Sequence, residues 1–277
     1  MKSYKVSLKK EYGLEGGELE CILGNDIYDT GASEWRRPAV IVVPGGGYWM
    51  VSKREGEPVA EAFLARGFQT FVLTYLCRPD GVRYPEQLAE LAAAVDYVKK
   101  HAEEMSVNPD EIFVVGFSAG GHLAGNLAVE WDCVAQKTGL SLDCRPTAVG
   151  LSYPVISYAC GHTDSFENLL EGYTEEAKEV LRKELSLDSR VTGSTAPAFI
   201  WTTAEDTCVP AENSMVFALA LAKKKIPYEL HIYPRGEHGS SVCNKEINIG
   251  GGDFLRKNSA WLDNCASFFR LFVKEDF

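Results

Sequence analysis

The stretch that decides the fold is Ile112-Phe113-Val114-Val115-Gly116-Phe117-Ser118-Ala119-Gly120-Gly121-His122. Its first four residues are apolar and three of them are β-branched, which predicts a fully buried strand. The Gly-x-Ser-x-Gly that follows is typical of a sharp turn from a strand into a helix, with Ser118 exposed at its tip. Gly116 and Gly120 suit this turn because they lack the Cβ atoms that would collide there. Ser118 is therefore the candidate nucleophile, and a structural serine in a tight turn is the alternative.

The composition narrows the class of protein. The chain has 277 residues, 45% of them hydrophobic, and a formal net charge of −11. This acidity disfavours nucleic acid and anionic membrane surfaces as partners, since both require clustered lysine and arginine. No apolar run is long enough to cross a membrane, and the N-terminus alternates like a strand instead of forming a secretion signal. Eight scattered cysteines without CxxC spacing indicate reduced thiols, so a cytoplasmic protein is expected.

Apolar strands alternate with amphipathic helices along the chain, without an intervening linker. The pattern predicts an α/β fold with a mostly parallel central sheet and helices on both faces, in a single domain over residues 1–277. Two antiparallel edge strands are expected at Tyr4–Leu8 and Leu19–Leu23, and Asn108-Pro109-Asp110 is expected to be a turn. Residues 161–190 interrupt this alternation of apolar strands and amphipathic helices. They are too polar for the core, so we expect a small, lid-like helical insertion there, with a solvated excursion as the alternative.

A second glycine-rich segment follows the predicted strand Pro38–Val43. It reads Pro44-Gly45-Gly46-Gly47-Tyr48-Trp49. Three glycines at the end of a strand allow several amide N–H groups to face one point, as an oxyanion hole requires. The alternatives are a plain connector or a phosphate loop. A phosphate loop would require Gly-Lys-Ser/Thr at its end, and a dinucleotide site would require G-x-G-x-x-G, and neither is present.

A serine hydroxyl requires a neutral imidazole to accept its proton, and the chain offers five histidines. Only His238 lies in a glycine-flanked loop directly after a late parallel strand, at the edge where Ser118 is presented. The others are less suited: His101 at a helix end, His122 along the helix of Ser118, His162 in the insertion and His231 within a strand. We therefore expect His238 to be the base.

The imidazole in turn requires a carboxylate that orients it. If the chain order is serine, acid, histidine, the acid lies at the end of a strand between Ser118 and His238. Asp206 fits this position, with its neighbour Glu205 as the rival. Asp253 follows His238 and is therefore out of order.

Together these segments resemble the α/β-hydrolase superfamily, and within it the bacterial esterase/lipase branch that includes acetyl esterases of acetylated xylan and other sugars. The resemblance covers roughly Pro38 to Trp261 and is carried by PGGGYW, GFSAGGH, TTAEDTCVPAENS, PRGEHG and the late Trp261-Leu262. It implies Ser118 as nucleophile, Asp206 as acid and His238 as base, with the backbone N–H groups of Gly46, Gly47 and Ala119 as the oxyanion hole. One departure is Pro44, which stands where this branch often has histidine.

The expected chemistry is two-step acyl transfer from a small ester, without a metal or an organic cofactor. The resemblance favours a short acyl group, with acetyl as the expected one, on a carbohydrate. Tyr48 and Trp49 are candidates to stack on a sugar ring, and core packing is the alternative for both. An arylformamidase or small peptidase would use the same triad, and a non-catalytic ligand-binding module is a further alternative. A homo-oligomer is compatible with the sequence.

Overall fold

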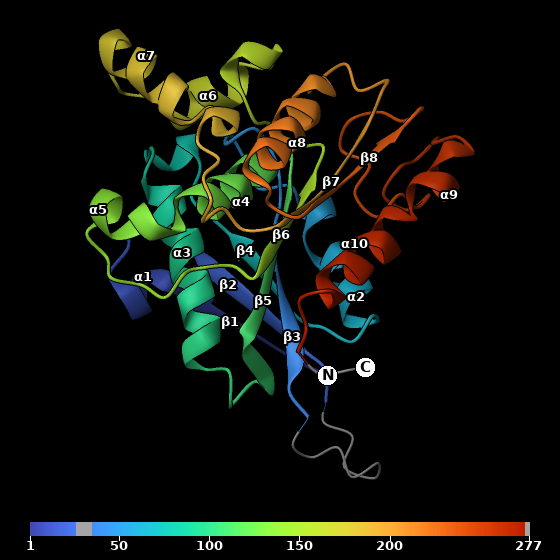
Figure 1. The fold of residues 1–277 in the computed structure, drawn as a ribbon. Coiled ribbons are helices and arrows are strands. Elements are labelled where there is room, and N and C mark those ends of the chain that lie inside the picture. The colour runs from blue at the N-terminus through green and yellow to red at the C-terminus, as the bar shows by residue number, and fades with distance from the viewer. Residues whose placement is uncertain (26–34, 275–277) are drawn as a thin grey trace.

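The computed structural model describes residues 1–25 and 35–274, whose strands form one twisted sheet (Figure 1). In this part of the chain the sheet has eight strands in the order β1-β2-β4-β3-β5-β6-β7-β8. Strand β2 runs antiparallel to both its neighbours, and all pairs from β4 to β8 are parallel, as predicted. The strands are β1 (Lys2–Ser7), β2 (Glu18–Leu23), β3 (Arg37–Val43), β4 (Gln69–Thr74), β5 (Val107–Phe117), β6 (Ala148–Ser152), β7 (Ala198–Thr203) and β8 (Tyr228–Tyr233).

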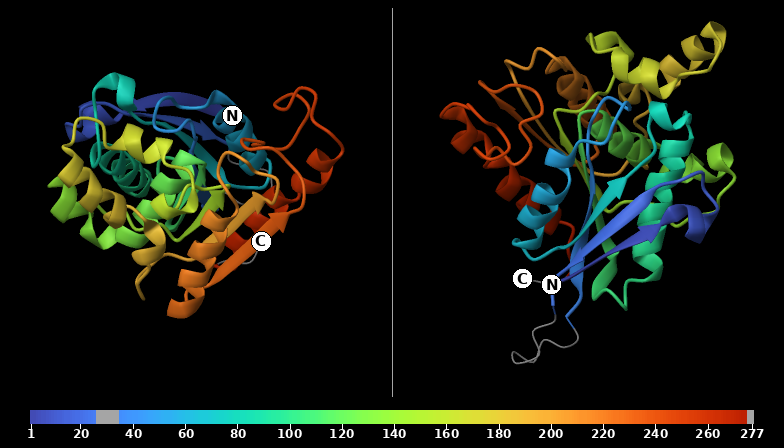
Figure 2. Two further views of the ribbon diagram at one scale, coloured as in Figure 1. Left: turned by 90° about the horizontal axis from the view of Figure 1, so that it is seen from above. Right: turned by 180° about the vertical axis from the view of Figure 1, so that it is seen from behind.

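The central strands are apolar along their whole length because both faces of the sheet are covered. In β3, Val40 and Val42 pack on one side and Ala39, Ile41 and Val43 on the other. Helices α2 and α10 supply the first layer, and α3, α4 and α8 supply the second (Figure 2). The helices are α1 (Leu8–Tyr12), α2 (Glu57–Leu64), α3 (Glu86–Lys100), α4 (Ala119–Glu130), α5 (Val134–Thr138), α6 (Asp164–Leu169), α7 (Glu175–Glu184), α8 (Glu212–Lys224), α9 (Phe254–Asn258) and α10 (Trp261–Arg270).

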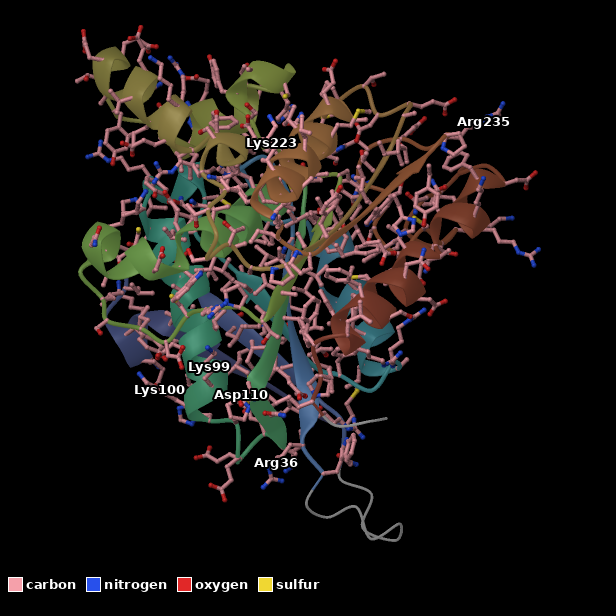
Figure 3. All side chains as sticks on the ribbon, viewed as in Figure 1. Arg36, Lys99, Lys100, Asp110, Lys223 and Arg235 are labelled. Carbon is pink, nitrogen blue, oxygen red and sulfur yellow. The ribbon has the colours of Figure 1, made fainter. Side chains whose placement is uncertain are left out.

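The carboxyl ends of the parallel strands all lie at one end of the sheet. Figure 3 shows Asp110, early in β5, at the lower end of the molecule, and Arg235, just after β8, near the upper end. Helices α6 and α7 lie at this upper end in Figure 1. The loops that follow β3, β5, β7 and β8 therefore meet beneath the insertion, as expected for ligand sites in open α/β sheets.

Two local expectations require correction. The segment between the two edge strands contains a short helix, α1, so the first strand ends at Ser7. Asn108-Pro109-Asp110 is not a turn but belongs to β5, whose register with β3 shifts between Arg37 and Ala39. This irregularity accommodates the proline, which cannot donate to the ladder.

The stretch from 161 to 190 forms helices α6 and α7, as expected, but the view that it is too polar for the core is wrong at five positions. Helix α7 has no buried residue. The buried apolar side chains lie in α6 and beside the two helices, where they contact the rest of the protein: Phe166, Leu169, Leu170, Leu185 and Leu187. The average polarity of the whole segment does not reveal these few buried apolar side chains. No helix in the described ranges has the length and apolarity to span a bilayer.

Candidate active site

Ser118 stands between the last residue of β5 and the first residue of α4, with a backbone φ of 53° and ψ of −118°. This strained conformation is maintained by close backbone packing. A Cβ on Gly116 would lie 2.2 Å from the carbonyl oxygen of Gly120, and one on Gly120 would lie 2.2 Å from that of Val43. Both glycines are therefore required by the sharp turn that exposes the Ser118 hydroxyl.

The structure brings Ser118, His238 and Asp206 together from the ends of β5, β8 and β7. His238 Nε2 lies 2.8 Å from Ser118 Oγ, and His238 Nδ1 lies 2.7 Å from Asp206 Oδ2. Because a carboxylate can only accept, Nδ1 carries the imidazole proton and the lone pair of Nε2 faces the hydroxyl. The rival carboxylate, Glu205, instead accepts a hydrogen bond from the backbone N–H of Gly236 at 3.3 Å.

Asp206 is held in one orientation by the turn that follows it. Its Oδ1 accepts hydrogen bonds from the backbone N–H groups of Cys208 at 2.9 Å and Val209 at 2.8 Å. The side chain is only 1% exposed, which leaves Oδ2 directed at the imidazole. On the other side, the ring of Tyr153 meets the ring of His238 edge to face at 4.9 Å. The imidazole is therefore fixed by a hydrogen bond and by packing.

The glycine-rich loop lies beside Ser118. Gly46 and Gly47 have φ values of 124° and 65°, and a Cβ on Gly46 would meet the carbonyl oxygen of Met50 at 1.9 Å. Within residues 1–25 and 35–274, the amide N–H groups of Gly46, Gly47 and Ala119 donate to no protein acceptor. Unpaired amides beside a nucleophile are the groups that an oxyanion hole requires.

In the absence of a histidine at position 44, other hydrogen bonds hold this loop. Four of them join its backbone to residues ten or more positions away. Tyr75 Oη donates to the Pro44 carbonyl at 2.8 Å, the Gly45 N–H donates to Glu55 Oε2 at 2.9 Å, Asn168 Nδ2 donates to the Gly47 carbonyl at 2.9 Å, and the Arg78 N–H donates to the Tyr48 carbonyl at 2.8 Å. The loop is thus fixed on both sides of its unpaired amides.

The interpretation of Tyr48 as a sugar platform is wrong. Its side chain is 1% exposed, and its hydroxyl donates to His122 Nδ1 at 2.8 Å. Its ring also meets Tyr75 edge to face, so no ring face is left for a ligand. Trp49 is 54% exposed, with the Arg78 guanidinium 5.3 Å from the ring centre, and it does not contribute to the cavity at Ser118.

His122 has a structural role, consistent with its exclusion as the base. Its Nε2–H donates to the Leu185 carbonyl at 2.8 Å, while Nδ1 accepts from Tyr48. Burial lowers the pKa of His122 to about 4, so it stays neutral at physiological pH. It thereby links α4 to the insertion.

A cavity of about 490 Å³ opens at the nucleophile. Its walls include Gly46, Gly47, Met50, Ser118, His162 and His238. Sequence reasoning placed His162 in the insertion without a role. Here its Nδ1–H donates to the Cys208 carbonyl at 3.0 Å and its Nε2 accepts from Ser165 Oγ at 2.9 Å, and burial lowers its pKa. Among the described residues, no group of three or more His, Cys, Asp or Glu is arranged to hold a metal ion.

Two further groups were missed by sequence reasoning. Glu55 is buried, and its Oε1 accepts from the Tyr153 hydroxyl at 2.8 Å. Tyr153 Oη accepts in turn from the Ser241 N–H at 2.9 Å. This pair connects the glycine loop to the His238 loop. Tyr153 directly follows β6, so its position at a carboxyl strand end was the available signal, whereas nothing local distinguished Glu55.

Comparisons with known proteins agree with this geometry. The model of the prolyl oligopeptidase family matches residues 86–267, and the BD-FAE model matches residues 25–144. Endo-1,4-beta-xylanase B of Butyrivibrio fibrisolvens is 39% identical over 79% of this chain and 35% of its own length. The acetylxylan esterase of Xylanibacter ruminicola is 31% identical over 73% of this chain and 40% of its own length. The chain thus spans well under half of these curated relatives.

A solved structure covers nearly the whole chain. The acetyl ester-xyloside bifunctional hydrolase of Caldicellulosiruptor lactoaceticus is 32% identical, covers 92% of this chain and 88% of its own, and superposes with a TM-score of 0.78. The expected resemblance is therefore confirmed: the chain belongs to the prolyl oligopeptidase family of the α/β-hydrolase superfamily.

Proposed function

We propose that this protein is a serine ester hydrolase that cleaves short-chain acyl esters, with acetylated carbohydrates as its substrate class. The observation that carries the proposal is the continuous hydrogen-bonded chain from Ser118 through His238 to Asp206, beside three unpaired backbone amides. This arrangement provides a nucleophile, a base and an oxyanion site within one cavity.

In the first step, Ser118 Oγ attacks the ester carbonyl carbon while His238 Nε2 accepts the hydroxyl proton. Asp206 stabilises the imidazolium that forms, because its carboxylate lies 2.7 Å from Nδ1 in a nearly solvent-free position. The carbonyl oxygen becomes negatively charged, and the amides of Gly46 or Gly47 together with Ala119 donate to it. The helix dipole of α4 adds to this stabilisation.

Collapse of the tetrahedral intermediate breaks the bond to the alcohol, and His238 returns the proton to the leaving oxygen. A water molecule then attacks the acyl-enzyme by the same route, with its proton passing to His238 and later to Ser118 Oγ. The products are the free alcohol and the carboxylic acid.

Two observations support a short acyl group on a carbohydrate. The cavity of about 490 Å³ is modest, and Met50 and His162 line it together with Ser118. Three relatives have names that refer to xylan or xyloside chemistry.

The eight cysteines are all unpaired thiols, which supports a reducing compartment, the cytoplasm, as part of the same proposal.

The test is hydrolysis of p-nitrophenyl acetate by the wild-type protein and by Ser118→Ala. The variant is expected to lose all triad-dependent turnover and to keep its circular dichroism spectrum, while Ser189→Ala, an exposed serine, keeps full activity. Turnover by Ser118→Ala at the wild-type rate would refute the assignment.

The substrate class is tested with a panel of acetyl, butyryl, feruloyl, formamide and prolyl-peptide substrates that includes acetylated xylo-oligosaccharides. The prolyl oligopeptidase match is the reason for including a peptide. The acetylated oligosaccharides are expected to give the highest kcat/KM, and preference for the formamide or peptide would replace the ester proposal.

A further inference from the structure

The candidate oxyanion donors of this site are backbone amides, so their direction depends on the orientation of the peptides in the glycine loop. Gly47 has a φ of 65°, and no side-chain atom lies closer than 3.9 Å to where its Cβ would be, so sterics at Gly47 do not by themselves fix the peptide that follows it. A rotated peptide would turn an amide N–H away from the oxyanion. Hydrogen bonds to the loop carbonyls therefore decide how much of the population is competent.

The longer-range hydrogen bonds to the backbone of Pro44, Gly45 and Tyr48 come from residues of the main α/β unit. The Gly46 carbonyl accepts locally, from the N–H groups of Trp49 at 3.0 Å and Met50 at 3.1 Å. The carbonyl of Gly47 is held differently. Its donor is Asn168 Nδ2, at 2.9 Å, from helix α6 of the insertion. The insertion thus contacts the loop at the peptide next to the unpaired Gly47 amide.

The Asn168 side chain is itself held in one orientation. Its Oδ1 accepts from the Arg78 guanidinium at 2.9 Å, which requires Nδ2 to be the atom that faces Gly47. Arg78 is fixed in turn, by an ion pair with Glu171 at 3.3 Å and by the Trp49 ring. The chain Arg78, Asn168, Gly47 therefore presents a preoriented donor to the loop.

We infer that Asn168 is a positioning residue for the oxyanion loop, so that the insertion supports catalysis and does not merely cover the site. This inference rests on the proposed ester hydrolysis. Asn168 acts through the Gly47 carbonyl and makes no contact with the reacting atoms. Its contribution belongs to the transition state, because the loop amides matter most when the carbonyl oxygen becomes negative.

The expected decrease in kcat is that of one lost hydrogen bond, which is smaller than that of one lost oxyanion donor. Complete removal of a donor costs about 10²–10³ in kcat, whereas loss of a single neutral hydrogen bond shifts a conformational equilibrium by about tenfold. Loss of the Asn168 donor leaves every oxyanion amide in the chain and only loosens the loop. The expected decrease in kcat is therefore about tenfold.

The experiment compares Asn168→Asp, which keeps the shape and the acceptor for Arg78 but has no donor for Gly47, with Asn168→Ala. The matched control is Glu179→Gln, which neutralises an exposed carboxylate on helix α7 of the same insertion, away from the Arg78, Asn168, Gly47 chain. The measurements are kcat and KM for p-nitrophenyl acetate, the inhibition constant of phenylboronic acid, the rate of Ser118 labelling by a fluorophosphonate, and the melting temperature.

Both Asn168 variants are expected to lower kcat about tenfold with KM within about twofold, and to weaken the boronic acid, which forms a tetrahedral adduct, by a similar factor. The pH profile of kcat/KM is expected to keep its midpoint, because the His238 and Asp206 pair is untouched. Glu179→Gln is expected to remain within about twofold of wild type.

The inference is overturned if both Asn168 variants keep wild-type kcat and boronic acid affinity, or if Glu179→Gln loses as much as they do. A decrease that appears only in KM, or only together with a lowered melting temperature in Asn168→Asp, also overturns it. If the wild-type protein fails to hydrolyse the ester, the proposed function fails by itself. The labelling rates then decide the inference, since phosphonylation of Ser118 uses the same oxyanion loop.

Discussion

Replacing Asp206 by asparagine should convert a proton-accepting imidazole into one that cannot accept. The two backbone N–H groups of Cys208 and Val209 already donate to the Oδ1 position. The asparagine oxygen must occupy that position, because an NH₂ group there would face two donors. The NH₂ group is then directed at His238 Nδ1, so the neutral imidazole carries its proton on Nε2, against Ser118.

The expected loss combines this wrong tautomer with the missing charge opposite the imidazolium. The equivalent change in a serine protease lowers kcat by about 10⁴, and we expect about 10³–10⁴ here because Asp206 is buried and forms the same contact with its histidine. That corresponds to about 4 to 5.5 kcal/mol of transition-state stabilisation. KM should change little, since Asp206 does not line the substrate cavity.

The assay is steady-state hydrolysis of p-nitrophenyl acetate by Asp206→Asn, with circular dichroism to verify the fold. Glu205→Gln is the matched control, because it neutralises the adjacent carboxylate and keeps an acceptor for the Gly236 N–H. The control should stay within about threefold of wild type. If Asp206→Asn retained more than about a tenth of wild-type kcat, or Glu205→Gln lost as much, the tautomer argument would be wrong.

Two further predictions concern stability. Gly120→Ala should lower the free energy of unfolding, measured by urea denaturation, by at least about 3 kcal/mol, because its Cβ would lie 2.2 Å from the Val43 carbonyl oxygen. The control Gly139→Ala has open space around its Cβ and should lose only about 1 kcal/mol. Equal losses would contradict the steric account. Burial raises the pKa of Glu90 from 4.5 to about 8, so between these pH values the folded protein retains a proton that the unfolded chain releases. The free energy of unfolding of the wild type should therefore decrease as the pH rises from 4.5 to about 8. Glu90→Gln should remove this slope and be more stable than the wild type by on the order of 3 kcal/mol at pH 7, and a parallel pH dependence of the two proteins would show that Glu90 is ionised in the fold.

Much of the fold was predictable because it depends on short-range patterns. Continuous apolar runs such as Ile112–Val115 can be buried only between two layers of helices. The glycines around Ser118 are required by a turn only five residues long. His238 and Asp206 were identified because the carboxyl ends of parallel strands meet at one edge, whatever the sequence distance between them.

The supports of the site were not predictable in this way. The Tyr48 hydroxyl meets His122 across 74 residues, Glu55 meets Tyr153 across 98, and Asn168 meets Gly47 across 121. Each partner is an ordinary polar residue within its own segment. The same limit explains why the sequence leaves both a sugar platform and core packing open for Tyr48, since an aromatic residue beside a glycine loop has the same local pattern whether it faces solvent or the core.

The sequence by itself determined the layered α/β architecture, because hydrophobic periodicity and turn chemistry are local. It also determined the identity of the three hydrogen-bonded residues Ser118, His238 and Asp206, because the carboxyl ends of parallel strands lie at one edge of the sheet. Only the tertiary structure decided which side chains hold the oxyanion loop and which aromatic residue is buried. Those outcomes depend on contacts between segments that are far apart in the chain, and no pattern within either segment encodes its partner.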